Sequence, residues 1–383
     1  MAIDTMRPCG DYRTSYRADQ TIFDTRLTFA FIVGGIILLA LAPLVLSNYY
    51  LSLMIQIGYL GIAALGLNIL VGFSGQISIG HAVFFGFGGF ASAFLAEHGV
   101  PVPIAIVLAG LWTTAVGLLF GLPATRVKGL YLAIATLAAQ FILQDFFVRA
   151  AWFTGGSSGA VAAPFTILGF DMSGDTRYFY VVLVFVVVMY LFAANLMRTR
   201  DGRALIAVRD HYLSAEMMGV NLAKYRTMAF GISSFYAGIG GALYAHYIGY
   251  MSVEGLDILF SIQFLAMIII GGLGSIMGSL LGTIFMVLLP DLAMIIIGGL
   301  GSIMGSLLGT IFMVLLPELT GALAGILQGS AIDRALHLKD GITYMREMLI
   351  GATIILFLIF EPDGLAHRWK QIKAYWKLYP FSY

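Results

Sequence analysis

The residues best suited to chemistry lie in one polar stretch inside apolar sequence. Residues 68–81 read NILVGFSGQISIGH, with glycines at positions 72, 75 and 80. The side chains in this stretch that can exchange hydrogen bonds are Asn68, Ser74, Gln76, Ser78 and His81. Unpaired backbone groups in hydrocarbon are costly, so such a break persists only where protein buries it or where it lines a wet cavity. We therefore expect these five side chains to line a translocation path.

Composition indicates a membrane protein around this stretch. Of the 383 residues, 60% are hydrophobic and 11% are charged. A soluble domain carries about 25% charged residues, so this chain cannot cover a surface that faces water. The net charge of +1 gives no reason to expect a nucleic-acid partner. The single cysteine, Cys9, excludes a disulfide framework within the chain.

Apolar segments predict an all-α polytopic protein with about 8–10 transmembrane helices, some of them re-entrant or broken. The segments lie near residues 27–47, 51–71, 80–96, 102–122, 129–148, 178–197, 227–249, 256–289, 292–316 and 345–360. The first run is longer than the apolar part of a signal peptide, which ends in a cleavage site of small residues. We expect it to be the first span. The membrane domain then covers residues 27–360.

The distribution of Lys and Arg predicts the orientation. Basic residues gather in residues 1–26, at Arg126 and Lys128, in residues 198–226, and in the tail, residues 361–383. The loop at residues 151–176 has neither Lys nor Arg. Both termini are therefore expected in the cytoplasm, and the loop at residues 151–176 is expected outside.

A tandem repeat interrupts the last third of the chain. Residues 265–290 recur without a change as residues 292–317, separated by Asp291. Structural repeats diverge because each copy meets different neighbours, so identity points to a recent duplication or an assembly error. We expect one helix to run across Pro290, kinked there. We also expect that deletion of residues 291–317 leaves a working protein.

The sequence lacks the residues that several kinds of chemistry require. No lysine stands in a G-x-x-x-x-G-K-[ST] pattern, so an ATP-driven process would need its motor on another chain. The six histidines show no metal-ligand spacing, and we expect no metal and no cofactor. Two serines stand in short protease-like patterns, Ser74 in residues 72–75 and Ser157 in residues 155–159. An intramembrane serine protease that uses Ser74, with His81 or His246 as base, is therefore one alternative.

Residues 198–226 form a second informative stretch. The stretch is charged, lies between two spans on the basic side, and carries apolar residues at a spacing typical of one or two short amphipathic helices. Gly219 is suited to end a helix in a left-handed turn. The stretch is either a solvated loop or a docking element for a cytoplasmic partner.

Seven segments together resemble one family. They are residues 67–81, 128–136, 154–159, 202–224, 241–246, 271–275 and 361–366. The chain is similar over residues 27–383 to LivM-type permease subunits of branched-chain amino acid ABC importers. The repeat departs from the family pattern, which has one GGLGS unit before the final span.

The resemblance implies a transport subunit that is not itself an enzyme. It implies that the protein lies in the bacterial inner membrane, in contact with lipid. The implied partners are a second, homologous permease, two ATP-binding subunits and a periplasmic substrate-binding protein. It also places the ATPase coupling segment at residues 202–224. The candidate coupling residues there are Gly202, Arg203, Arg209, Ala215, Glu216 and Gly219.

Two further alternatives stay open at this point. The same architecture could import urea, short amides or other amino acids. A secondary transporter would work alone and would usually carry ionisable groups inside its spans. Asp145, Glu97 and His98 lie near the ends of spans, which disfavours that class.

Overall fold

The computed structural model describes residues 26–124, 127, 129–167 and 170–298, and these are almost entirely helical. The chain divides into two compact units, Met1–Thr283 with Asp363–Tyr383, and Ile284–Pro362. The long helices of the first unit are α2 (Arg26–Leu41), α3 (Asn48–Asn68), α4 (His81–Glu97), α5 (Val102–Ala124), α6 (Leu130–Arg149), α8 (Asp175–Arg198), α11 (Leu222–Ile248) and α12 (Ile258–Gly271). Helix α13 (Ile276–Gly298) begins in this unit and continues into the second.

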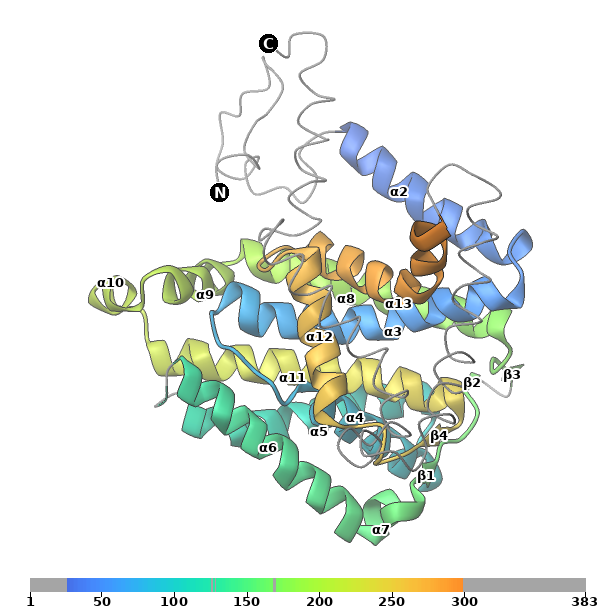
Figure 1. Ribbon diagram of the computed structural model, residues 1–383, viewed down its shortest axis with the longest axis horizontal. Helices are drawn as coiled ribbons and strands as arrows, with labels where there is room; N and C mark the ends of the chain where they lie inside the picture. The colour runs from blue at the N-terminus through green and yellow to red at the C-terminus, as the bar shows by residue number, and fades with distance from the viewer. Residues whose placement is uncertain (1–25, 125–126, 128, 168–169, 299–383) are drawn as a thin grey trace, which may run out of the picture. The chain divides into compact units, whose positions relative to one another are not determined.

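Short elements connect these helices. They are η2 (Ala42–Leu44), η3 (Ile69–Phe73), α7 (Ala151–Thr154), η4 (Gly156–Ser158), α9 (Arg200–Asp210) and α10 (Tyr212–Met217). Strand β1 (Ala160–Val161) pairs antiparallel with β4 (Tyr250–Met251), and β2 (Thr166–Ile167) pairs with β3 (Phe170–Asp171). Within the first unit, α9 and α10 lie at one end of the long helices and the strands at the other (Figure 1). Which end faces the cytoplasm stays a prediction from the charge distribution.

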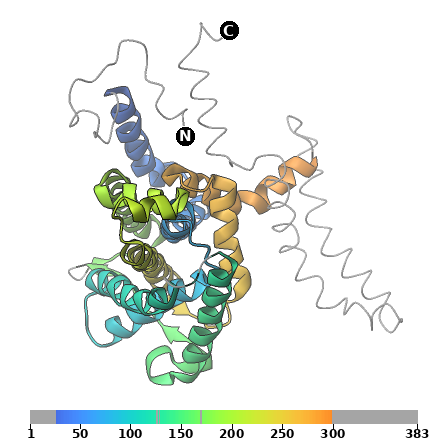
Figure 2. The ribbon, with the colours of Figure 1, turned by 90° about the vertical axis from the view of Figure 1, so that its left-hand side faces the viewer.

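Helices α3 and α11 form the core of the first unit. In each of them 78% of the most apolar window is buried, against 39% in α5 and α6 and 28% in α8. Viewed from the α9–α10 end, α11 is seen nearly end-on among its neighbours, whereas α12 runs across the view (Figure 2). The outer helices therefore present apolar faces suited to lipid or to a partner subunit.

Glycines bring α4 against α11. A Cβ atom on Gly241 would collide with the carbonyl oxygen of Phe85, and one on Gly88 would collide with the backbone of Gly238. Small residues at such crossings let helix backbones approach closely. This close crossing holds the buried helix α4 in place directly after the polar stretch.

The described residues contain five helices long and apolar enough to cross a membrane, or up to six if the bent pair α12–α13 is one span. The helices follow the apolar segments expected from the sequence, and the all-α, membrane-spanning fold with a broken helix is confirmed. The total of 8–10 spans includes segments outside the described residues, so it stays a prediction.

The described residues include the whole first copy of the repeat and the first residues of the second copy, 292–298. Helix α13 runs through Pro290 and Asp291 to Gly298, so one helix joins the first copy to the second. The kink expected at Pro290 stays a prediction. The rest of the second copy and the tail lie outside the described residues. Whether the second copy can be deleted stays a prediction.

Candidate functional site

The polar stretch begins where α3 loses its regular helical pattern. Residues Ile69–Phe73 form a π-helix, and the backbone then runs without regular structure to Gly80, where α4 starts. π-Helical turns inside α-helices are often found at functional sites. Gly75 has a φ of 72°, in the left-handed region that glycine adopts without strain. The glycines therefore allow α3 to end sharply inside the protein.

All five side chains predicted to line a path are buried in this chain. Asn68 is fully buried, and Ser74, Gln76, Ser78 and His81 are at most 4% exposed. The Oγ of Ser74 donates to the carbonyl of Leu70 at 2.7 Å, and Nε2 of Gln76 donates to Ser74 Oγ at 2.7 Å. These two hydrogen bonds pair polar groups at the end of α3 with one another.

Two polar atoms of the stretch have no hydrogen-bond partner among the described residues. They are Oε1 of Gln76 and Oγ of Ser78, and both are buried. Buried polar atoms are nearly always paired, with protein or with water. These two atoms are thus the ones most ready to bind water or a solute.

His81 holds the start of α4 against α3 and α12. Its Nε2 lies 2.9 Å from the carbonyl oxygen of Ala63, and its ring packs edge-on against Phe264 at 5.3 Å. The neighbouring backbone N–H of Ala82 donates to Oγ of Ser261 at 2.9 Å. Three helices therefore meet at the first turn of α4.

Asn68 joins α3 to a second helix break, between α12 and α13. Its Oδ1 accepts from the N–H of Gly274 at 2.9 Å, and its Nδ2 donates to Ser275 O and Ser279 Oγ, both at 2.8 Å. Helices α12 and α13 are bent by 119° at this break. One amide thus satisfies backbone groups that the bend leaves without helical partners.

Helix α6 supplies polar residues that sequence reasoning missed. Nε2 of Gln140 and Nε2 of Gln144 both donate to the carbonyl of Leu256 at 2.8 Å, and Ser261 Oγ donates to Gln140 Oε1 at 3.1 Å. Thr136 Oγ1 accepts from the N–H of Ile79 at 3.0 Å. Thr136, Gln140 and Gln144 recur at every fourth position, so the signal was a polar stripe on an apolar helix.

The predicted coupling segment forms two short helices, α9 and α10. Gly202 lies directly against the backbone of Leu196 and Met197, where α9 folds back on the end of α8. Oγ1 of Thr199 caps α9 by accepting from the N–H of Gly202 at 3.3 Å. The glycine is needed because a side chain here would meet the end of α8. The fold of this segment is therefore compact, with α9 docked on the bundle.

The remaining candidate coupling residues lie on different faces of the two helices. Ala215 is buried, whereas Arg203 and Glu216 are exposed. Gly219 ends the turn after α10 with a φ of 84°. Glu216 is thus free of packing against the bundle and is available at the surface of this chain.

Arg209 reaches from α9 to the polar stretch. One terminal nitrogen of its guanidinium donates to the carbonyl of Gly72 at 2.7 Å. Its Nε donates to the carboxylate of Asp210 at 2.8 Å. The structure therefore brings the coupling segment and the helix break together, a contact that the sequence did not reveal.

The serine and histidine residues do not form the pair expected for a protease at Ser74. The described hydrogen bonds connect Ser74 to Leu70 and Gln76, and His81 to Ala63. Oγ of Ser214 lies 3.1 Å from Nδ1 of His211 at the exposed start of α10. A second such pair is Ser92, whose Oγ lies 2.8 Å from Nε2 of His246. Ser92 is fully buried, so this pair links α4 to α11 without access for a substrate.

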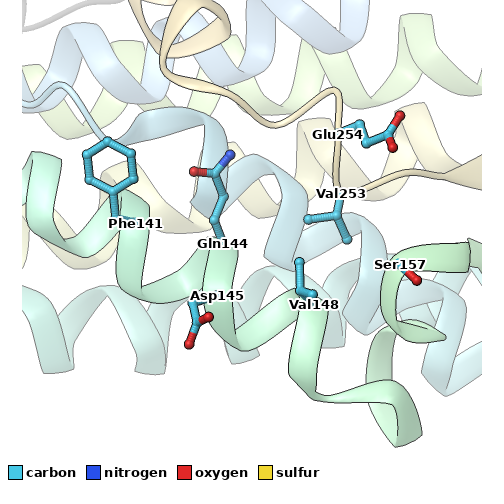
Figure 3. A pocket seen from close by; sticks show the side chains of 7 residues that line it. All are labelled: Phe141, Gln144, Asp145, Val148, Ser157, Val253 and Glu254. Atoms are coloured by element: carbon cyan, nitrogen blue, oxygen red, sulfur yellow. The ribbon is translucent and has the colours of Figure 1, made fainter.

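An open groove of about 420 Å³ lies beside the C-terminal half of α6, at the end of the bundle that carries the strands. Its lining side chains are Phe141, Gln144, Asp145, Val148, Ser157, Val253 and Glu254 (Figure 3). The carboxylate of Asp145 forms an exposed ion pair with Arg149 at 2.7 Å. Ser157 lies on the wall of this groove, in the short turn η4.

The chain is similar to known membrane proteins over most of its length. The family model described as the permease component of a branched-chain amino acid transport system matches residues 49–292. The chain belongs to this family. The match includes the polar stretch, residues 198–226 and the break between α12 and α13. The chain is thus an ABC transporter permease component, and its long apolar helices are transmembrane helices.

Individual relatives carry the same description. The chain is 30% identical over 214 residues to the permease protein LivM of the high-affinity branched-chain amino acid transport system of Salmonella typhimurium, covering 50% of each chain. It is 29% identical over 282 residues to the LivM protein of Escherichia coli, covering 67% of this chain and 66% of that protein. It is 29% identical over 190 residues to a probable LivM permease of Methanocaldococcus jannaschii. The chain therefore spans half to two thirds of the length of these relatives. No solved structure matches it.

Proposed function

We propose that this chain is the membrane-spanning subunit of an ATP-driven importer for branched-chain, apolar amino acids. Separate ATPase subunits supply the energy, because the sequence has no phosphate-binding loop of its own. The printed function of the relatives supports the substrate class. Urea, short amides and other amino acids remain the competing substrates of the same architecture.

The observation that carries the proposal is the exposed surface of α10. Leu213, Met217 and Met218 are 52%, 88% and 84% exposed. Leu213 and Met217 lie on α10, and Met218 directly follows it. The proposal places this charged end of the bundle in the cytoplasm, outside the lipid. Exposed apolar residues rimmed by polar ones mark protein-interaction sites, and methionine adapts well to a partner's groove. We assign this surface to the ATPase subunit.

The chemistry of the polar stretch is compatible with the substrate. An amino acid with an apolar side chain is a zwitterion without net charge, and a path for it needs hydrogen-bonding groups rather than fixed charges. The free Gln76 Oε1 and Ser78 Oγ are such groups. The stretch would open to the substrate when the permease pair changes between its outward- and inward-open states.

The assembly follows from the proposal. Two permeases form the membrane part, two ATPases bind below at α9–α10, and a periplasmic binding protein delivers substrate at the opposite face. The location is then the bacterial inner membrane, with both termini in the cytoplasm. ATP binding moves α9–α10, and the transport cycle requires that this segment fits the ATPase differently in the two states.

Charge reversal at Glu216 tests the ATPase contact. Glu216→Lys and Met217→Asp should lower the amount of ATPase that co-purifies with the permease, and transport should fall with it. Glu97→Lys, an exposed charge reversal at the other end of the bundle, is the matched control and should change neither. Unchanged co-purification and unchanged uptake in both α10 variants would contradict the assignment.

A further inference from the structure

Arg209 lies where three segments of the chain meet. It is the penultimate residue of α9, and its guanidinium donates to the carbonyl of Gly72 in η3. A Cβ atom built on Gly274 would lie 2.9 Å from the same guanidinium nitrogen, so Arg209 also borders the break between α12 and α13. One side chain on the coupling segment thus touches both interruptions of the transmembrane helices.

The bond to Gly72 has a clear physical reason. The last carbonyls of a helix lack intrahelical partners and carry the negative end of the helix dipole. Arg209 brings a permanent positive charge to this end, and cations are favoured there. The guanidinium therefore acts as a helix cap supplied by a distant segment.

Apolar packing holds α9 beside the same helix end. Leu205, one turn before Arg209, is fully buried in a cluster that includes Leu70 of η3. Phe230 of α11 and Leu132 of α6 belong to the same cluster. Because close-packed groups move together, a displacement of α9 is transmitted to η3 through both Leu205 and Arg209.

The two breaks are also joined directly to each other. Oδ1 of Asn68 accepts from Gly274, and a Cβ atom on Gly72 would collide with the backbone of Gly274. The backbone segments thus touch without room for a side chain. A force that reaches η3 reaches the α12–α13 break as well.

We propose that Arg209 is a positioning residue through which α9–α10 sets the conformation of both helix breaks. This inference rests on the proposed function, because the ATPase is what would move α9–α10. Arg209 contacts no substrate. Its role is to transmit the position of the coupling segment to the part of the chain that carries Gln76 and Ser78.

A first experiment measures whether Arg209 stabilises the breaks in the purified complex without nucleotide. Hydrogen exchange in residues 70–76 and 272–276 should become about tenfold faster or more in Arg209→Ala, since hydrogen bonds to charged groups contribute stability of that order. Arg209→Lys keeps the charge but lacks the planar fork, and its exchange should be intermediate. Arg200→Ala, an exposed arginine at the start of the same helix, is the matched control and should exchange like the parent.

A second experiment measures whether a change at α10 reaches the break between α12 and α13. A residue that only caps a helix would not affect this. Leu273 in the break and Leu213 on α10 are each half exposed. Each is replaced by cysteine in a chain that also carries Cys9→Ser, and the rate of reaction with a small thiol reagent is measured with and without ATP. ATP should slow labelling at position 213 and change labelling at position 273.

The labelling rates at positions 213 and 273 distinguish the possible results. In Arg209→Ala the ATP effect at position 273 should be lost while the effect at 213 persists, and Arg209→Lys should restore part of it. An unchanged ATP effect at 273 in Arg209→Ala, with exchange like the parent, would overturn the role of Arg209 and leave the proposed function standing. Absence of any ATP effect at 213 in the parent would overturn the proposed function and this inference with it.

Discussion

The side-chain oxygen of Asn68 accepts a hydrogen bond from the backbone N–H of Gly274 at 2.9 Å, which ties the end of one helix to the break in another. The same amide donates to Ser275 and Ser279. The two helix interruptions that the sequence places far apart are therefore one structural unit. Changes to either should be felt in both.

Loss of the Asn68 amide should loosen this unit. In Asn68→Ala the N–H of Gly274 loses its partner, and interhelical hydrogen bonds in membrane proteins contribute roughly 0.6–2 kcal/mol each. We expect a lower midpoint of thermal unfolding in detergent and faster hydrogen exchange in residues 272–276. Asn195→Ala on α8, at an exposed position, should leave both unchanged. A midpoint for Asn68→Ala equal to that of the control would argue against the tie.

A side chain at position 241 should disrupt the α4–α11 crossing. The Cβ atom of Gly241→Ala would collide with the Phe85 carbonyl, and backbone cannot yield as a flexible side chain does. Overpacking of a close-packed interior costs about 1–3 kcal/mol. We expect reduced accumulation in the membrane and a lower unfolding midpoint, measured beside Gly34→Ala, where no atom lies within 4 Å of the added methyl. Equal behaviour of the two variants would show that the crossing is wider than described.

Much of the fold could be predicted from the sequence, because the apolar segments and the glycine-rich interruptions are local signals. The break after Asn68 was predicted from its glycines and polar residues. The bend at residues 272–275 lies inside the expected apolar segment 256–289, where only the glycines of the GGLGS unit mark it. The hydrogen-bond partners were not visible. Asn68 was expected to line a path, and its amide is engaged with the α12–α13 break, a pairing between distant segments that no periodicity encodes.

The hydrogen-bond partner of Arg209 in the predicted coupling segment could not be predicted from the sequence either. The family resemblance placed Arg209 among the candidate coupling residues, and in the structure it lies on α9. Its partner is a backbone carbonyl, which every residue carries, so no residue type could mark Gly72 as the acceptor. The stripe of Thr136, Gln140 and Gln144 was detectable, because polar residues at every fourth position of an apolar helix predict a buried polar contact.

Cysteines in the polar stretch should report a wet path. Gln76→Cys, Ser78→Cys and His81→Cys, each with Cys9→Ser, are expected to react with a small water-soluble thiol reagent as the assembled transporter turns over, and substrate should slow the reaction. Ser92→Cys, which replaces a fully buried serine bonded to His246, serves as the buried control. Inertness at all three positions under turnover would favour a purely helix-joining role for these side chains.

The native cysteine reports the orientation. With the N-terminus in the cytoplasm, Cys9 should stay unlabelled when an impermeant thiol reagent is added outside intact cells, and it should react once the membrane is opened. A Ser158→Cys variant with Cys9→Ser, exposed between α7 and β1, should react from outside. Labelling of Cys9 in intact cells would reverse the topology.

Transport by the reconstituted assembly tests the central claim most directly. The chain is placed in vesicles with its partner permease, the ATPase subunits and the binding protein, and uptake of radiolabelled leucine is measured with ATP, without ATP, and against urea and a short amide. The account predicts leucine uptake that requires ATP and is strongly reduced by Glu216→Lys. Uptake of leucine by this chain alone without ATP, or ATP-driven uptake of urea or the amide with none of leucine, would contradict it.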